Sequence, residues 1–128
     1  GDHRDLPSFP PRRSSDLAVR AVRGSAGGVP VVTAALSWLQ HLAPFVAAGL
    51  VRESWCELVG FGRSAFAYPD APRDILQRGG MAPEKCCVTC SMCSQIMKDV
   101  AGRGGCVVRD SAVYAPEYRK GRAAARGV

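Results

Sequence analysis

Residues 57–63 read ELVGFGR, a short apolar run that closes on glycine and arginine. Residues 29–34 read VPVVTA and are again short, mostly apolar and rich in β-branched side chains. Runs of this length and composition predict strands buried on both faces, as in a parallel sheet. Helices are expected to begin at Ser37 and near Ser64, one after each strand. Two strand–helix units in succession predict an α/β protein with a parallel sheet.

Proline and glycine mark where the helices start, bend and stop. In the helix that opens at Ser37, Gln40 stands at the capping-box position, Pro44 is expected to introduce a kink and Gly49 suits the C-terminal cap. A further short helix is expected over residues 72–77, from a proline to a pair of glycines. Two strand–helix units cannot close a sheet, so the pattern also predicts partner strands outside this chain.

We divide the chain into four segments. Residues 1–17 are rich in proline and serine and predict a disordered leader. They also resemble translated sequencing-adapter DNA, so we expect a non-native leader and a native sequence that starts near Ala18, in mid-protein. Residues 18–83 hold the strand–helix units, residues 84–110 form a cysteine-rich segment and residues 111–128 form a basic tail.

The composition fits one folded domain without a membrane anchor. Of 128 residues, 47% are hydrophobic and 22% are charged, which allows a packed core. Residues 1–17 lack the apolar segment of an export signal, and polar residues interrupt the most apolar stretch, residues 29–51. We therefore expect a cytoplasmic protein with no membrane partner. A reducing compartment argues against a disulfide framework among its six cysteines.

The net charge of +6 raises the question of nucleic acid binding. The clearest basic cluster lies near the C-terminus and comprises Arg119, Lys120, Arg122 and Arg126. It lacks the interleaved aromatic side chains that stack on bases. We interpret it as a frayed basic tail and do not expect nucleic acid as a partner.

The strongest chemical signal is a C-x2-C-x2-C-x12-C pattern. Its members are Cys87, Cys90, Cys93 and Cys106. Closely spaced thiolates can turn towards one metal centre, and the distant fourth thiolate completes a tetrahedral set. Three interpretations stay open, in this order: a [4Fe–4S] cluster, reduced cysteines without a ligand, and a structural zinc site. Zinc ribbons usually separate two cysteine pairs by a longer loop, which places zinc last. Cys56, outside the pattern, predicts a buried small side chain.

The strand ends carry the second signal, because ligands of parallel α/β sheets bind beyond the carboxyl ends of the strands. There, Gly62 and Arg63 offer an unhindered backbone N–H, a helix start and a guanidinium, which together suit a phosphate. Ala34 and Ala35 follow the other strand and lack the glycines that phosphate loops prefer. The sequence shows no catalytic constellation: His41 has no obvious acidic partner.

These residues resemble the C-terminal part of the Old Yellow Enzyme family, the NADH:flavin oxidoreductases. The eighth strand of that family typically reads D-L-V-G-x-G-R and is followed by P-D-x-P, and here residues 57–63 read ELVGFGR and residues 69–72 read PDAP. The stretch from PVV-TA to AAGL resembles the preceding unit. The resemblance covers roughly residues 26–110. It implies a C-terminal fragment, about the last two β/α units, of a TIM (β/α)8 barrel with a cysteine-rich tail.

The resemblance also implies cofactors. FMN is expected, its phosphate held by Gly62 and Arg63 and by the loop of Ala34 and Ala35, where the family usually carries glycine. The cysteine spacing is similar to that of the branch with trimethylamine dehydrogenase and 2,4-dienoyl-CoA reductase, which carries a [4Fe–4S] cluster. The parent protein would pass hydride from NAD(P)H through FMN to or from a small unsaturated or amine substrate.

The family residues that orient the substrate and donate the proton lie on earlier strands. We therefore expect no catalytic residue in this chain, no activity of the chain alone, and the missing N-terminal part of the barrel as its partner. A different class stays open beside this one: a small four-cysteine zinc-binding or nucleic-acid interaction module.

Overall fold

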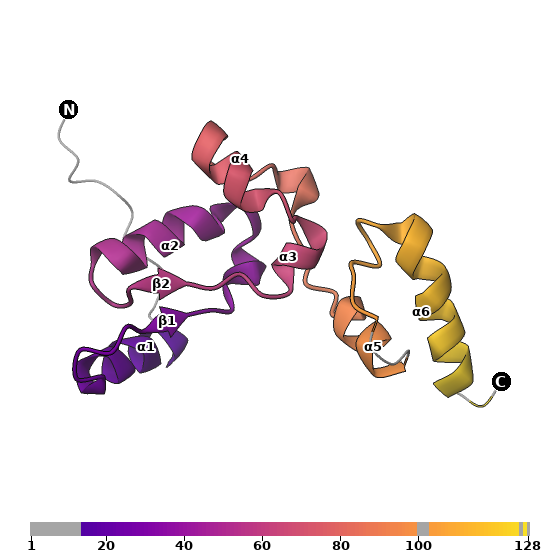
Figure 1. Ribbon diagram of the computed structural model, residues 1–128, viewed down its shortest axis with the longest axis horizontal. Coiled ribbons are helices and arrows are strands. Elements are labelled where there is room, and N and C mark those ends of the chain that lie inside the picture. The colour runs from indigo at the N-terminus through magenta and orange to yellow at the C-terminus, as the bar shows by residue number, and fades with distance from the viewer. Residues whose placement is uncertain (1–13, 100–102, 126, 128) are drawn as a thin grey trace.

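The computed structural model describes residues 14–99, 103–125 and 127. Its elements, with η for a 3₁₀ helix, are α1 (Ser14–Ser25), β1 (Val32–Thr33), η1 (Leu36–Leu42), α2 (Ala43–Arg52), β2 (Leu58–Val59), α3 (Ser64–Ala67), α4 (Ala71–Arg78), η2 (Pro83–Lys85), α5 (Met92–Asp99) and α6 (Ser111–Ala125). The described residues form a mixed α/β protein that is mostly helical. Figure 1 shows an elongated arrangement, with the two strands at one end and α5 and α6 at the other.

The two strands pair in parallel, as the sequence predicts. Val32 pairs with Leu58 and Thr33 with Val59, and the crossover between them contains η1 and α2. The ladder continues one step further, since the N–H of Gly60 donates to the carbonyl oxygen of Thr33 at 2.7 Å. Each strand is shorter than expected. Two short parallel strands do not distinguish a barrel fragment from other parallel sheets.

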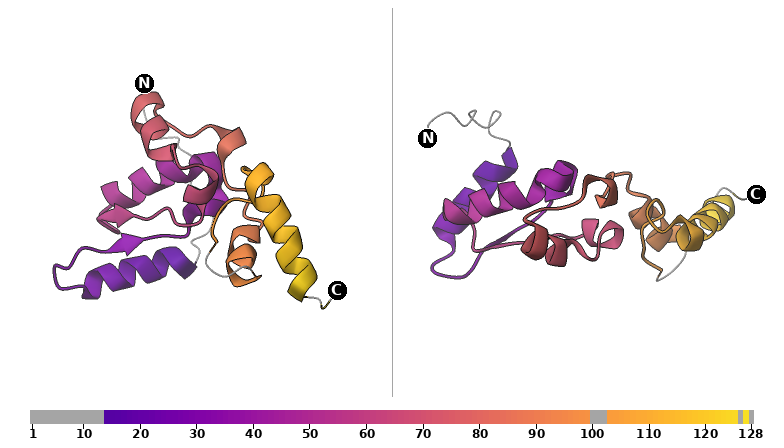
Figure 2. Two further views of the ribbon diagram at one scale, coloured as in Figure 1. Left: turned by 45° about the vertical axis from the view of Figure 1, so that its right-hand side comes forward. Right: turned by 90° about the horizontal axis from the view of Figure 1, so that it is seen from above.

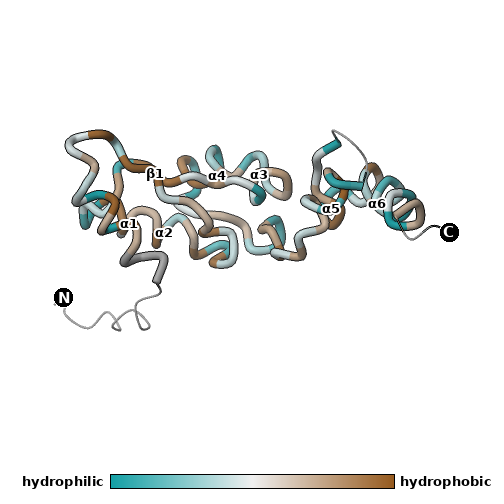
Figure 3. Tube along the Cα trace, turned by 90° about the horizontal axis from the view of Figure 1, so that it is seen from below, coloured by the Kyte–Doolittle hydropathy of each residue, from teal (hydrophilic) through white to brown (hydrophobic). Residues whose placement is uncertain are grey.

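The prediction that both faces of the strands are buried is wrong. Thr33 is only 7% exposed, whereas Val32 and Leu58 are each 58% exposed. The reason is that the core lies on one side of the sheet. Val59 packs there against a small cluster of apolar side chains from η1 and α2, namely Leu36, Ala43 and Ala47. The hydrophobic run along β1, coloured brown in Figure 3, is therefore half covered and half open to solvent.

The segment after β1 differs from the expected kinked helix. Residues 36–42 form a 3₁₀ helix in which Gln40 leaves helical geometry, at φ 52° and ψ −125°. Pro44 does not kink a helix but lies in the first turn of α2, where its missing N–H costs no hydrogen bond. Gly49 does not end the helix, because α2 continues to Arg52.

The elements after β2 agree with the sequence predictions. Helix α3 begins at Ser64, and α4 carries Pro72 in its first turn. Gly79 closes α4 in a left-handed conformation at φ 74°, which glycine adopts without steric cost. Cys56 is only 2% exposed, as predicted for a small buried side chain, and this burial raises the pKa of its thiol.

The C-terminal end of the molecule is a pair of helices. Helices α5 and α6 lie side by side in both figures that show the ribbon (Figures 1 and 2). Ile96 of α5 is fully buried, and Asp99 pairs with Arg122 of α6 at 3.3 Å. The prediction of a frayed basic tail is therefore wrong for most of its length, because residues 111–125 form α6. Arg126 lies outside the described residues.

At the other end of the chain, residues 1–13 of the expected leader lie outside the described residues, and α1 begins at Ser14. Helix α1 is tied to the sheet by Glu57, whose carboxylate lies 2.6 Å from Arg23 and also accepts the N–H of Val31 at 2.7 Å. Among the described residues, no helix has the length and apolar character needed to cross a membrane.

Candidate functional site

The carboxyl ends of β1 and β2 meet at one edge of the sheet. A Cβ placed on Gly60 would lie 3.7 Å from the Cβ of Ala34, so the loops after the two strands are in contact. The sequence-predicted residues Ala34 and Ala35 therefore lie beside the loop that leads to Gly62 and Arg63. We call these four residues the sheet-edge site.

The backbone at this edge is accessible. A Cβ on Gly62 would meet no atom within 4 Å, and Ala34, Ala35 and Arg63 are exposed. Ala35 adopts a left-handed conformation, at φ 70° and ψ 26°, which an alanine disfavours and a glycine does not. Helix α3, which follows Arg63, is only four residues long, so its dipole adds little to anion binding.

The side chain of Arg63 reaches a distant part of the chain. Its Nη1 donates to the hydroxyl of Ser91 at 3.1 Å and to that of Ser94 at 3.5 Å. Ser91 immediately precedes α5 and Ser94 lies in its first turn, so both belong to the cysteine-rich segment. The two regions that the sequence singles out are thus joined by one guanidinium.

The four cysteines of the spaced pattern differ in their surroundings. Cys93 is buried in the first turn of α5, Cys87 and Cys106 are half-buried, and Cys90 is exposed. Within residues 14–99, 103–125 and 127, no three histidine, cysteine, aspartate or glutamate side chains are grouped so that they could hold a metal ion. Metal binding would therefore require the four thiols to converge from these positions.

Local backbone geometry nevertheless turns amide groups towards two of these sulfurs. The N–H of Thr89 donates to Sγ of Cys87 at 3.3 Å, and the N–H of Arg109 donates to Sγ of Cys106 at 3.3 Å. Thr89 and Ser91 both have positive φ, at 55° and 61°, so the chain turns tightly between the closely spaced cysteines. Hydrogen bonds of this kind stabilise thiolates and tune sulfur-bound clusters.

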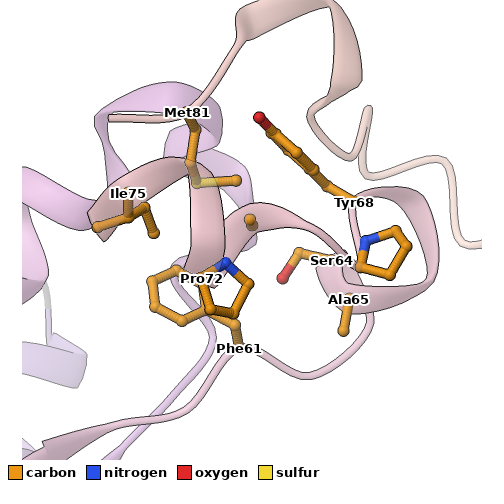
Figure 4. Close-up of a pocket in the computed structure, with 9 residues that line it drawn as sticks. Phe61, Ser64, Ala65, Tyr68, Pro72, Ile75 and Met81 are labelled. Carbon is orange, nitrogen blue, oxygen red and sulfur yellow. The ribbon is translucent and has the colours of Figure 1, made fainter. Parts of the chain in front are cut away.

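A small pocket lies behind the sheet-edge site. Its volume is about 110 Å³, and Phe61, Tyr68, Pro72, Ile75 and Met81 form much of its wall (Figure 4). The hydroxyl of Ser64 points into it and has no hydrogen-bond partner. Ligand pockets usually measure about 300–1,000 Å³, so this one alone does not hold a molecule of the size of a flavin.

One buried polar network is not among the features predicted from the sequence. Asp74 is 1% exposed and accepts a short hydrogen bond from the hydroxyl of Tyr68, with Nζ of Lys85 at 3.4 Å from the same oxygen. The hydrogen bond from Tyr68 lowers the pKa of Asp74, and its carboxylate raises the pKa of Tyr68. The ammonium of Lys85 also lies 5.1 Å from the ring centre of Tyr68. The sequence holds no signal that this aspartate is buried.

The network fixes the start of the cysteine-rich segment. The hydroxyl of Tyr68 accepts the N–H of Ala82 at 3.3 Å, and Sγ of Cys86 donates to the carbonyl of Ala82 at 3.4 Å. Cys86 itself is 1% exposed, and burial raises the pKa of its thiol. It is thus a poor candidate for an extra metal ligand.

No protein-family description matches this chain, and neither the curated proteins nor the solved structures include one with significant similarity.

Proposed function

We propose that this chain is the C-terminal part of an FMN-dependent NAD(P)H:flavin oxidoreductase of the Old Yellow Enzyme type, built on a TIM (β/α)8 barrel. In this proposal it contributes part of the FMN phosphate site and a four-cysteine centre. The observation that carries the proposal is the reach of Arg63. It leaves the carboxyl edge of a parallel sheet and hydrogen-bonds Ser91 and Ser94, between the cysteines.

The open side of the sheet supports further strand–helix units. Parallel sheets are normally covered on both faces, yet Val32 and Leu58 leave one face exposed. An open groove of about 500 Å³ also runs between α2 and β2, with Ala47, Val51 and Leu58 in its walls. Further units of the same kind would cover both surfaces. In this proposal, the genomic sequence around this coding region encodes them in the same reading frame.

The sheet-edge site suits the phosphate of FMN. The unhindered backbone at Gly62 leaves room for an anion, and Arg63 can exchange two bonds to neutral hydroxyls for stronger bonds to a charged phosphate. Ala35, in the loop after β1, has a left-handed backbone conformation, which glycine usually adopts. FMN itself would supply the hydride-carrying group. This chain would hold its phosphate.

The cysteine set suits a [4Fe–4S] cluster in its chemistry. Four thiols stand in two segments, and two of them already accept backbone N–H groups. A cluster at this place would accept and release single electrons. In our proposal the protein is cytoplasmic, where the thiols stay reduced, and its partners are NAD(P)H, a small-molecule substrate and the rest of the barrel.

The metal content tests the cysteine centre. The chain, purified without oxygen and treated with iron and sulfide, should bind both and show a broad brown absorption. Cys90→Ala should abolish it, whereas Cys56→Ala, outside the pattern, should leave it unchanged. Colourless protein that retains zinc would instead support the second candidate, a four-cysteine zinc module. Protein that holds neither metal would rule out both.

Binding of FMN tests the sheet-edge site. We expect FMN to shift the amide NMR signals of Gly62 and Arg63 weakly, and riboflavin, which lacks the phosphate, to leave them in place. Arg63→Gln should remove the effect, and Arg73→Gln, which changes another exposed arginine, on α4, should not. The isolated chain should not oxidise NAD(P)H, since it carries no proposed catalytic residue. Turnover by the chain alone would refute this part of the proposal.

A further inference from the structure

The turn that carries Cys106 is tied to the segment that carries Cys87 by the side chain of Arg109. Its Nη2 and Nε donate to the carbonyl oxygen of Cys86 at 2.7 Å and 3.1 Å. The backbone N–H of the same residue donates to Sγ of Cys106 at 3.3 Å. One residue therefore binds to both cysteine-bearing segments, although Cys86 and Arg109 are 23 positions apart.

The turn itself is held by a backbone hydrogen bond and by an aromatic ring. The N–H of Asp110 donates to the carbonyl of Cys106 at 3.0 Å, which closes the turn around Arg109. On its other side the ring of Tyr114 packs directly on Gly105, so closely that any Cβ at this position would overlap the ring. Cys106 is thus held between α6 and the segment around Cys86.

The guanidinium group explains why an arginine serves here. Its two N–H donors lie in one plane and converge on one carbonyl oxygen, a geometry that the single ammonium of lysine does not reproduce. Both donors come from one side chain, so a single residue holds the carbonyl of Cys86 against the turn of Cys106.

We propose that Arg109 is a positioning residue of the four-cysteine centre, which holds Cys106 beside Cys87 so that the thiolates can converge on one metal group. The part that concerns metal binding rests on the proposed function. The part that concerns the two segments does not, because Arg109 bonds directly to the carbonyl of Cys86 and to Sγ of Cys106.

The first experiment measures that approach without metal. Metal-free, reduced protein is treated with a short bismaleimide reagent, and the Cys87–Cys106 cross-link is quantified by peptide mass spectrometry. Arg109→Gln should lower the yield several-fold, and Arg109→Lys should restore part of it through one remaining hydrogen bond. Arg103→Gln is the matched control. It removes the same charge from the same segment, where the guanidinium of Arg103 pairs with Glu117 at 3.5 Å.

The second experiment measures metal retention. After loading with iron and sulfide, the Arg109→Gln protein should release its iron to a chelator several times faster than the unchanged chain. Arg109→Lys should lie between the two, and Arg103→Gln should match the unchanged chain. Equal cross-linking and equal retention in Arg109→Gln and the unchanged chain would overturn the proposal.

The two experiments separate the two claims. If the unchanged chain binds no metal, the proposed cysteine centre fails, while the cross-link yields still decide whether Arg109 holds the two segments together. If Arg109→Gln loses its helical circular dichroism, the comparison of Arg109→Lys with Arg103→Gln decides the matter. In that comparison, Arg109→Lys must show reduced cross-linking for the proposal to stand.

Discussion

The two ends of this molecule are held together in different ways. The sheet end relies on apolar packing of η1 and α2 against one face of β1 and β2, and its opposite face stays open. The α5–α6 end relies on polar contacts between distant residues, such as Arg109 with Cys86 and Arg122 with Asp99. The sheet end is thus built around a small apolar core with one exposed face, whereas the cysteine-rich end also depends on specific hydrogen bonds and ion pairs between distant residues.

The largest expected effect is a loss of stability at the α5–α6 end. Gly105→Ala places a Cβ inside the ring of Tyr114, which must move away from its position against the turn. We expect the free energy of unfolding to fall by about 3 kcal/mol, as in strongly overpacked cores. Urea denaturation followed by circular dichroism measures this. The control is Gly62→Ala, where a Cβ meets open space and little change is expected. Equal stability of both variants would contradict the packing seen here.

Two leucines test whether only one face of the sheet is packed. Leu36 is 9% exposed in the core, and its truncation to alanine should cost about 2 kcal/mol. Leu58 is 58% exposed on the open face, so Leu58→Ala should cost no more than about 0.5 kcal/mol in this chain. The same urea experiment compares them. A large cost at Leu58 would mean that its face is already covered, for example by a second copy of the chain.

The buried network of Asp74, Tyr68 and Lys85, between the two ends, should respond to pH. The pKa of Asp74 is lowered in the folded chain, so its contribution to stability is present above its ordinary value of 3.8 and is lost as the pH falls towards the folded pKa. Asp74→Asn should therefore remove part of the acid dependence of unfolding. Denaturation series between pH 3 and neutrality would show this, with Asp70→Asn as the exposed control. Parallel curves for Asp74→Asn and the unchanged chain would contradict it.

The smallest expected effects distinguish the ion pairs of α6. Arg122 pairs with Asp99, whose side chain is only 8% exposed, and Arg122→Gln should lower stability by about 1 kcal/mol. The pair of Arg103 with Glu117 is more exposed, and Arg103→Gln should change stability by less than about 0.5 kcal/mol. High salt should reduce the stability effect of Arg103→Gln by a larger fraction than that of Arg122→Gln. The reverse order would show that burial of Asp99 does not strengthen its pair.

Much of the sheet end was predictable because its signals are local. The short β-branched runs gave two parallel strands, Pro72 and Gly79 bounded α4, and Cys56 was buried as expected. The errors also have local causes. Pro44 can stand in the first turn of a helix or, at the cost of a kink, in its interior, and the residues around it do not by themselves choose between the two positions.

The sequence by itself determined the strands, their parallel pairing, the strand-end loops and the spacing of the cysteines. Only the tertiary structure decided that Arg63 binds Ser91 and Ser94, that Arg109 spans the two cysteine segments, and that Asp74 is buried beside Tyr68. The physical reason is that helix and strand propensities act over a few residues. A hydrogen bond from an arginine side chain to a residue 23 or 28 positions away exists only once the intervening elements have docked, so no local pattern records it.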